Sequence, residues 1–81
     1  MDREPLLSNI DKVHTTETGI VRIKKNLKLT TDDVVGYCKN KIPDKNCNIR
    51  KRGKNFYCEI DNIRITVNSY RCTIITAHIF Q

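Results

Sequence analysis

The chain of 81 residues is long enough for one small hydrophobic core and excludes a second domain, so we expect a single domain over residues 1–81. It carries 15 Lys and Arg against 9 Asp and Glu, and the formal net charge of +6 favours polyanions or acidic protein surfaces as partners. No stretch approaches the roughly 20 apolar residues that cross a bilayer, and the amino terminus lacks a signal-peptide pattern. We therefore expect a cytoplasmic protein that does not contact membranes.

Helical periodicity marks the first half of the chain, between residues 5 and 42. The first segment has Pro5 in its first turn and continues through Leu6, Ile10 and Val13. Thr15 or Thr16 can cap a second segment, whose apolar side chains recur on one side. These side chains are Ile20, Ile23 and Leu27. The two segments form either one bent helix or two separate helices.

A third helix is expected before Pro43, which ends it. Thr30 or Thr31 can cap this helix, and Asp32 and Asp33 then place acidic groups in its first turn. The buried side is formed by Val34, Cys38 and Ile42.

Between residues 47 and 79 the apolar period changes to two, which is typical of strands joined by short turns. A two-residue turn at Arg52-Gly53 would set Ile49 opposite Phe56 and Cys47 opposite Cys58. The first two strands then form a hairpin.

Two further connections complete a meander. A turn at Asp61-Asn62 sets Glu59 opposite Arg64, and a loop of residues 69–71 would set Arg64 opposite Thr76. A change of one residue in that loop would turn the last strand over, so the register of the last strand stays open.

This register gathers the apolar side chains on one face of the sheet, where helices can cover them. They are Ile49, Phe56, Cys58, Ile60, Ile63, Ile65, Val67, Ile75, Ala77 and Ile79. The opposite face is polar except for Ile74, and it displays Arg50, Asn55, Tyr57, Glu59, Arg64, Thr66, Asn68, Thr76 and His78. We therefore predict an α+β fold: two or three amino-terminal helices packed on one face of a four-stranded antiparallel meander sheet.

The polar face has the groups required for RNA cleavage without a metal. Glu59 and His78 can take and return protons, and Arg64 can stabilise charge on the phosphate. Two simpler interpretations stay open: Glu59 and Arg64 can be an ordinary cross-strand ion pair, and His78 an exposed strand end.

Other side chains suit nucleic-acid binding. Tyr57 can stack a base, and Thr66, Asn68 or Thr76 can hold phosphate oxygens. A basic run can follow a phosphate backbone, or can simply be a solvated turn. Its members on the first hairpin are Arg50, Lys51, Arg52 and Lys54.

The four cysteines are widely spaced, with no C-x-x-C pair and no nearby histidine at metal-ligand spacing. We expect no metal site and no cofactor, and we interpret the cysteines as buried, reduced side chains.

Several strings resemble a small bacterial domain family catalogued as of unknown function. They include Asn9–Ile20, Arg22–Leu27, Asp33–Lys39 and Thr73–His78. More loosely, the chain resembles the ribonuclease fold of barnase, EndoU-type nucleases and RelE-type toxins. That resemblance implies site residues at His14, Arg22 and Thr76, with His78 following. It also implies an antitoxin as a protein partner.

The sequence predicts an RNA-binding protein that acts as a metal-independent endoribonuclease of the toxin type. The alternative is a small basic inhibitor without enzymatic activity, which binds a partner protein or its nucleic-acid groove. A structural module of a larger complex is a third interpretation. The oligomeric state is left open.

Overall fold

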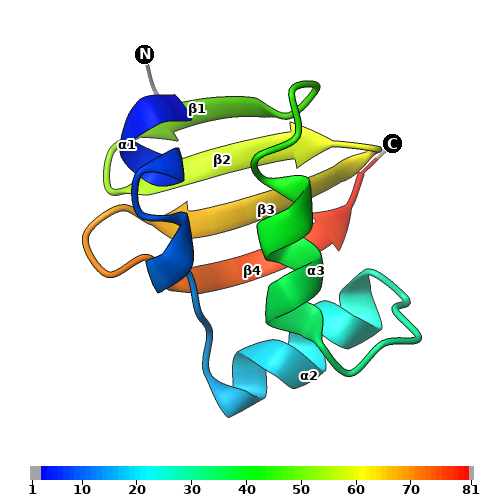
Figure 1. Cartoon of the computed structure of the whole chain (residues 1–81). Helices are drawn as coiled ribbons and strands as arrows, with labels where there is room; N and C mark the ends of the chain where they lie inside the picture. Colours follow the sequence, from blue (N-terminus) through cyan, green and yellow to red (C-terminus); the bar gives the residue numbers. More distant parts are fainter. Residues whose placement is uncertain (1–2, 81) are drawn as a thin grey trace.

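The computed structural model describes residues 3–80, and its strands form one antiparallel meander in the order β1-β2-β3-β4 (Figure 1). The strands are β1 (Asn48–Arg52), β2 (Asn55–Ile60), β3 (Ile63–Asn68) and β4 (Ile74–Ile79). The helices that precede them are α1 (Arg3–Leu7), the 3-10 helix η1 (Ile10–Lys12), α2 (Glu17–Asn26) and α3 (Val34–Lys41). The fold is therefore α+β, as the change of apolar period predicted.

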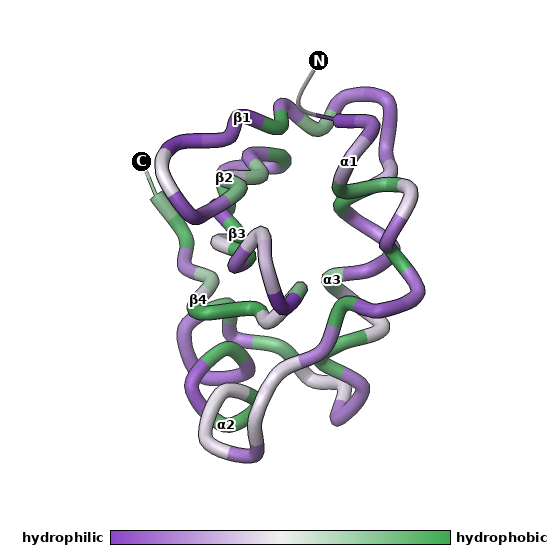
Figure 2. The backbone as a smooth tube through the Cα atoms, turned by 90° about the vertical axis from the view of Figure 1, so that its left-hand side faces the viewer, coloured by the Kyte–Doolittle hydropathy of each residue, from purple (hydrophilic) through white to green (hydrophobic). Residues whose placement is uncertain are grey.

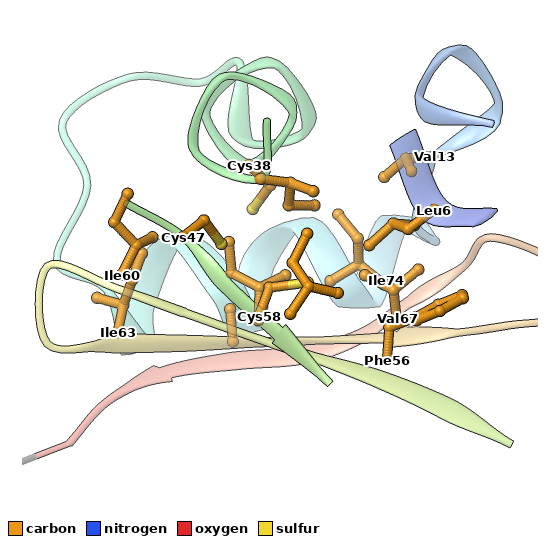
Figure 3. Packing of buried hydrophobic residues seen from close by; sticks show 14 of the residues in the cluster. Leu6, Val13, Cys38, Cys47, Phe56, Cys58, Ile60, Ile63, Val67 and Ile74 are labelled. Carbon is orange, nitrogen blue, oxygen red and sulfur yellow. The ribbon is translucent and has the colours of Figure 1, made fainter. Parts of the chain in front are cut away.

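The helices leave one face of the sheet open. Figure 2 shows α1 and α3 on one side of the strands and α2 beyond β4. Apolar side chains from the sheet point toward this helical layer, and Figure 3 shows Cys38 of α3 packed above Cys58 of β2. Within residues 3–80, no helix covers the other side. We call that side the open face, and it carries the outward residues of the strands: Asn48, Arg50, Arg52, Asn55, Tyr57, Glu59, Arg64, Thr66, Asn68, Thr76 and His78.

Side-chain caps start the two longer helices. Thr16, one of the two predicted caps, accepts a hydrogen bond from the backbone N–H of Gly19 at 3.0 Å. Asp33 accepts one from the N–H of Gly36 at 3.0 Å and is the cap of α3. The predicted cap at Thr30-Thr31 is therefore wrong, because the carboxylate adjoining the helix reaches its free N–H groups.

The predicted first helical segment is interrupted before Val13. The α-helical part ends at Leu7, and Val13 is extended, with ψ of 130°. The reason is a long-range contact: the next residue, His14, forms a parallel bridge with Thr73 at the start of β4. An extended backbone is needed for that pairing, so tertiary contact overrides the helical period.

The first hairpin turn lies at Gly53-Lys54 rather than at Arg52-Gly53. Gly53 has φ of 60°, and a glycine with positive φ at the first central position is the usual requirement of a type II′ turn. The register moves by two residues, so Ile49 lies opposite Cys58 and not opposite Phe56. Cys47 precedes β1 and is not paired across the strands with Cys58 as predicted. A shift of two keeps every side chain on its predicted face.

The last strand contains a bulge that the sequence analysis did not predict. Val67 pairs with Ile74 but Thr66 pairs with Thr76, so Ile75 has no partner in β3. Ile74 is 1% exposed and Ile75 is 46% exposed, which reverses their predicted positions.

Three further predictions for this part of the sheet are wrong. Arg64 lies opposite His78, not Thr76, and the connection from β3 to β4 spans residues 69–73 instead of 69–71. Ile79, the last residue of β4, is 41% exposed rather than buried, although its register partner Ile63 is in the core.

All four cysteines are free and buried, in agreement with their interpretation as apolar core residues. Burial raises the pKa of the Cys38 thiol from 9.0 to about 12. A hydrogen bond with Cys47, together with burial, raises the pKa of Cys58 as well. These thiols are protonated at neutral pH. None of the helices formed by residues 3–80 has the length and apolar character needed to span a membrane.

Candidate functional site

The register arranges the open face in three rows that run across the strands. The first row crosses β2, β3 and β4 and contains Glu59, Arg64 and His78. The second row contains Arg50, Tyr57, Thr66 and Thr76. The third row contains Arg52, Asn55 and Asn68. Most of the predicted site residues therefore do share one face.

Glu59 is the electrostatic centre of the open face. Its Oε2 accepts a hydrogen bond from Arg64 Nε at 2.8 Å and lies 2.6 Å from Arg64 Nη2. Its Oε1 lies 3.5 Å from Arg50 Nη2. The Glu59 side chain is only 18% exposed, whereas those of Arg64 and Arg50 are 39% and 57% exposed. One carboxylate therefore orients two guanidinium groups that both reach solvent.

Arg64 is held from a second direction by Phe80. The guanidinium carbon lies 5.4 Å from the centre of the Phe80 ring, which is within cation–π range. The Phe80 N–H donates to Asn62 O at 2.8 Å, so the end of the chain that carries the ring is fixed to the β2–β3 turn. Arg64 is thus positioned before any ligand arrives.

A shallow hollow of about 290 Å³ lies over the same residues. Its lining consists of Arg50, Arg52, Tyr57, Glu59 and Arg64. Three arginines against one carboxylate give this hollow a positive charge, and an aromatic ring forms part of its wall. A phosphate group with an attached base has matching chemistry.

The second row places Thr66 between Tyr57 and Thr76. Thr66 is only 6% exposed, so its neighbours cover most of it. Thr76 is partly buried. The hydroxyl of Thr76 is therefore the more accessible of the two for a phosphate oxygen.

The basic run of the first hairpin is divided between the two faces. Arg50 and Arg52 lie on the open face, but Lys51 is the register partner of the core residue Phe56. Lys51 therefore belongs to the helix-covered side, where it borders a hollow beside α1. Successive side chains of a strand point to opposite faces, which causes this division. The sequence analysis missed it because it treated the basic run as one loop. Lys54 is exposed in the turn itself.

His14 lies away from the first row. It pairs with Thr73, whereas His78 is five residues further along β4, about 16 Å at 3.3 Å per residue. Its Nδ1 lies 2.9 Å from Lys12 O and its Nε2 lies 3.1 Å from Thr73 Oγ1. A carbonyl can only accept, so Nδ1 donates to it, and in the neutral ring Nε2 then accepts from the threonine hydroxyl. Nε2 therefore links His14 to the residue that precedes β4, while Nδ1 contacts the end of η1.

Arg22 is an exposed residue of α2, next to the buried Ile23. The helix that carries it lies beyond β4, not over the open face (Figure 1). The structure thus separates His14 and Arg22 from Glu59, Arg64 and His78, so the two predicted sets are distinct places.

Asn48, Asn55 and Phe80 were absent from the predicted site although they lie on or beside the open face. Asn55 lies two residues before Tyr57 and shares its side of β2, a position that strand periodicity alone indicates. Phe80 lies two residues beyond His78, but its contact with Arg64 depends on how the chain end turns. Among residues 3–80, no group of three His, Cys, Asp or Glu side chains has a geometry that could hold a metal ion.

Comparison with known proteins assigns the chain to a family. A family model described as "Protein of unknown function (DUF3781)" matches residues 7–78, so the chain belongs to that family. No curated protein and no solved structure matches the chain. The looser resemblance to the ribonuclease toxin fold therefore stays a prediction.

Proposed function

Since the description of its family assigns no activity, we propose from the geometry that this protein binds RNA on the open face and cleaves it without a metal. One observation carries the proposal: Glu59, Arg64 and His78 occupy adjacent positions in one row of three strands. Neighbouring strands lie about 4.8 Å apart, so the backbones of Glu59 and His78 are separated by about 10 Å, with the strand of Arg64 between them.

That spacing suits in-line displacement at phosphorus. In RNA the attacking 2′ oxygen and the leaving 5′ oxygen lie on opposite sides of the phosphorus atom. A phosphate bound over Arg64 would direct one of these oxygens toward Glu59 and the other toward His78. A base and an acid on opposite sides of a central cation match this requirement.

The reaction balances with these groups alone. The Glu59 carboxylate takes the proton of the 2′-OH, and the 2′ oxygen forms a bond to phosphorus. The bond from phosphorus to the 5′ oxygen breaks, and the His78 imidazolium donates a proton to that oxygen. Arg64, with Arg50, offsets the charge that develops on the phosphate. The products are a 2′,3′-cyclic phosphate and a 5′-OH.

The ion pairs of Glu59 support a second candidate function. Both carboxylate oxygens face arginines, so a carboxylate that only positions Arg50 and Arg64 is chemically sufficient for binding. Such a protein would be a basic inhibitor that occupies a partner's nucleic-acid groove or an acidic surface. In the enzyme, the incoming phosphate would compete for both guanidinium groups and leave a carboxylate oxygen free to accept the proton.

Cleavage assays separate the two functions. We expect Glu59→Gln and His78→Ala each to lower the cleavage rate by on the order of a hundredfold, the usual scale for removing a positioned base or acid. Glu4→Gln, an exposed change of the same kind in α1, should have no effect. Cleavage should continue in the presence of a chelator and yield cyclic phosphate ends, and DNA should resist because it lacks the attacking hydroxyl.

The protein should be unfolded and refolded before the assay, since this removes any tightly bound antitoxin. Refolded protein that binds RNA but leaves varied sequences intact would reject the enzyme and favour the binding protein. Cleavage that survives in both variants but is lost in His14→Ala would move the site to the start of β4.

A further inference from the structure

Asn68, in the third row of the open face, is fixed by its surroundings more tightly than any other amide there. Its Oδ1 accepts hydrogen bonds from the backbone N–H groups of Tyr70 and Arg71, both at 2.9 Å. Its backbone N–H donates to Thr73 O at 2.8 Å, and its C=O accepts from the Cys72 N–H at 2.9 Å. The amide orientation is therefore determined, because only the oxygen can accept from two N–H groups.

This arrangement leaves the Nδ2 group of Asn68 as a donor in a fixed place. Two N–H bonds remain, and within residues 3–80 neither has a hydrogen-bond acceptor. The side chain is partly buried. The Nδ2 atom is not among the buried side-chain atoms without a partner in residues 3–80, so it reaches solvent and can exchange water for an acceptor on a ligand.

The neighbours of Asn68 supply the rest of a base-binding subsite. Asn55 is its register partner on β2, and Tyr57 lies two residues from Asn55 on the same side of that strand. Ser69 N donates to Lys54 O at 2.7 Å, so the β3–β4 loop is fixed to the first hairpin turn. The Tyr57 ring also borders the hollow that Arg50 and Arg64 line. A phosphate in that hollow would place an adjacent base over Tyr57 with its edge toward the two amides.

We propose that Tyr57, Asn55 and Asn68 form a nucleobase subsite that selects bases with carbonyl acceptors, and uracil over adenine. The proposal rests on RNA binding at the open face and names the determinant of its base preference. Adenine presents its ring acceptors N1 and N7 beside an amino donor, and an asparagine usually binds adenine by donating to N7 while accepting from that amino group. Asn68 cannot form this pair of bonds, because its Oδ1 already accepts from the Tyr70 and Arg71 N–H groups. Its remaining N–H groups match the carbonyl oxygens of uracil, which have no amino group beside them, so Asn68 favours uracil. Stacking on Tyr57 alone would favour adenine, because a purine has the larger ring surface.

Because the Asn68 donor and stacking on Tyr57 favour different bases, the ratio of affinities for uracil and adenine tests the proposal directly. Affinity is measured by fluorescence anisotropy with short 2′-O-methyl oligouridylate and oligoadenylate, which cannot be cleaved by attack of the 2′ oxygen. The wild type should bind the uridine probe more tightly, on the order of tenfold. Asn68→Asp retains an oxygen for the Tyr70 and Arg71 N–H groups but replaces the donor by an acceptor. The preference of this variant for the uridine probe should therefore disappear or reverse.

Asn48→Asp is the matched control, since it adds the same charge to an exposed position of the open face outside the subsite. This variant should bind both probes more weakly to the same extent, so the ratio of the two affinities should stay as in the wild type. Thermal unfolding of each variant verifies the fold. A wild type that binds adenine as well as or better than uracil would overturn the subsite, and so would a uracil preference that survives in Asn68→Asp. In both of those cases RNA binding itself stands, whereas binding of neither probe overturns the proposed function together with its subsite.

Discussion

Alanine substitution of two adjacent isoleucines in β4 should have very different effects on stability. Ile74 is 1% exposed and Ile75 is 46% exposed, because the bulge after Val67 directs Ile74 into the core. Truncating a fully buried isoleucine costs about 2–5 kcal/mol, from lost burial and from the cavity that remains. A surface substitution is usually within about 0.5 kcal/mol. Ile74→Ala should therefore lower the free energy of unfolding by at least about 1.5 kcal/mol more than Ile75→Ala.

The pair is well matched for this comparison. Both variants make the same chemical change in the same strand, so the difference in strand propensity between isoleucine and alanine largely cancels. Urea unfolding followed by circular dichroism gives both free energies, and the m-value shows whether the compactness of either state changed. Equal losses, or a larger loss for Ile75→Ala, would refute the bulge and restore the regular strand that simple alternation predicts.

Three further outcomes follow from individual residues. The free energy of unfolding should fall as pH rises from about 9 to about 12, since the raised pKa of Cys38 makes the unfolded chain lose this proton first. Urea titrations of Cys38→Ala should show a smaller fall, and an equal fall would contradict this cause. Arg52→Gln should reduce the salt slope of RNA affinity by about one, whereas Lys51→Gln, on the helix-covered side, should leave it nearly unchanged. Equal salt slopes in the two variants would contradict the placement of Arg52 on the open face and Lys51 on the helix-covered side. Gly53→Ala should lower the free energy of unfolding, measured in urea, by about 1 kcal/mol, because a residue with a Cβ is strained at φ of 60°. The space around the added Cβ is open, so no clash adds to this cost. An unchanged free energy of unfolding would mean that the turn relaxes.

The sequence determined the faces of the sheet better than its register. Alternation identifies which residues point inward, since burial of one face selects them whatever their partners are. Arg52-Gly53 and Gly53-Lys54 were both acceptable two-residue turns, and only the backbone conformation of Gly53 distinguishes them. The error moved each cross-strand partner by two residues and left the open face intact.

Two other features depend on contacts that no local pattern carries. The dipeptide Ile74-Ile75 is apolar at both positions, so alternation cannot indicate which residue is buried. His14 was predicted to be a catalytic candidate. Its pairing with Thr73, 59 residues further along the chain, could not be read from the sequence. Long-range pairing of this kind is invisible to periodicity, and it gives a structural role to a residue whose type suggests catalysis.

The bulge in β4 connects the core to the proposed chemistry. In a regular strand Ile74, Thr76 and His78 would share one face, so burying the isoleucine would direct the histidine into the core as well. The unpaired Ile75 changes the alternation: Ile74 and Ala77 are both buried, while Thr76 and His78 lie in the rows of Thr66 and Arg64. Bulges often redirect a side chain beside a functional site. Here the same device fills the core at the start of the strand and brings a histidine next to Arg64 at its end.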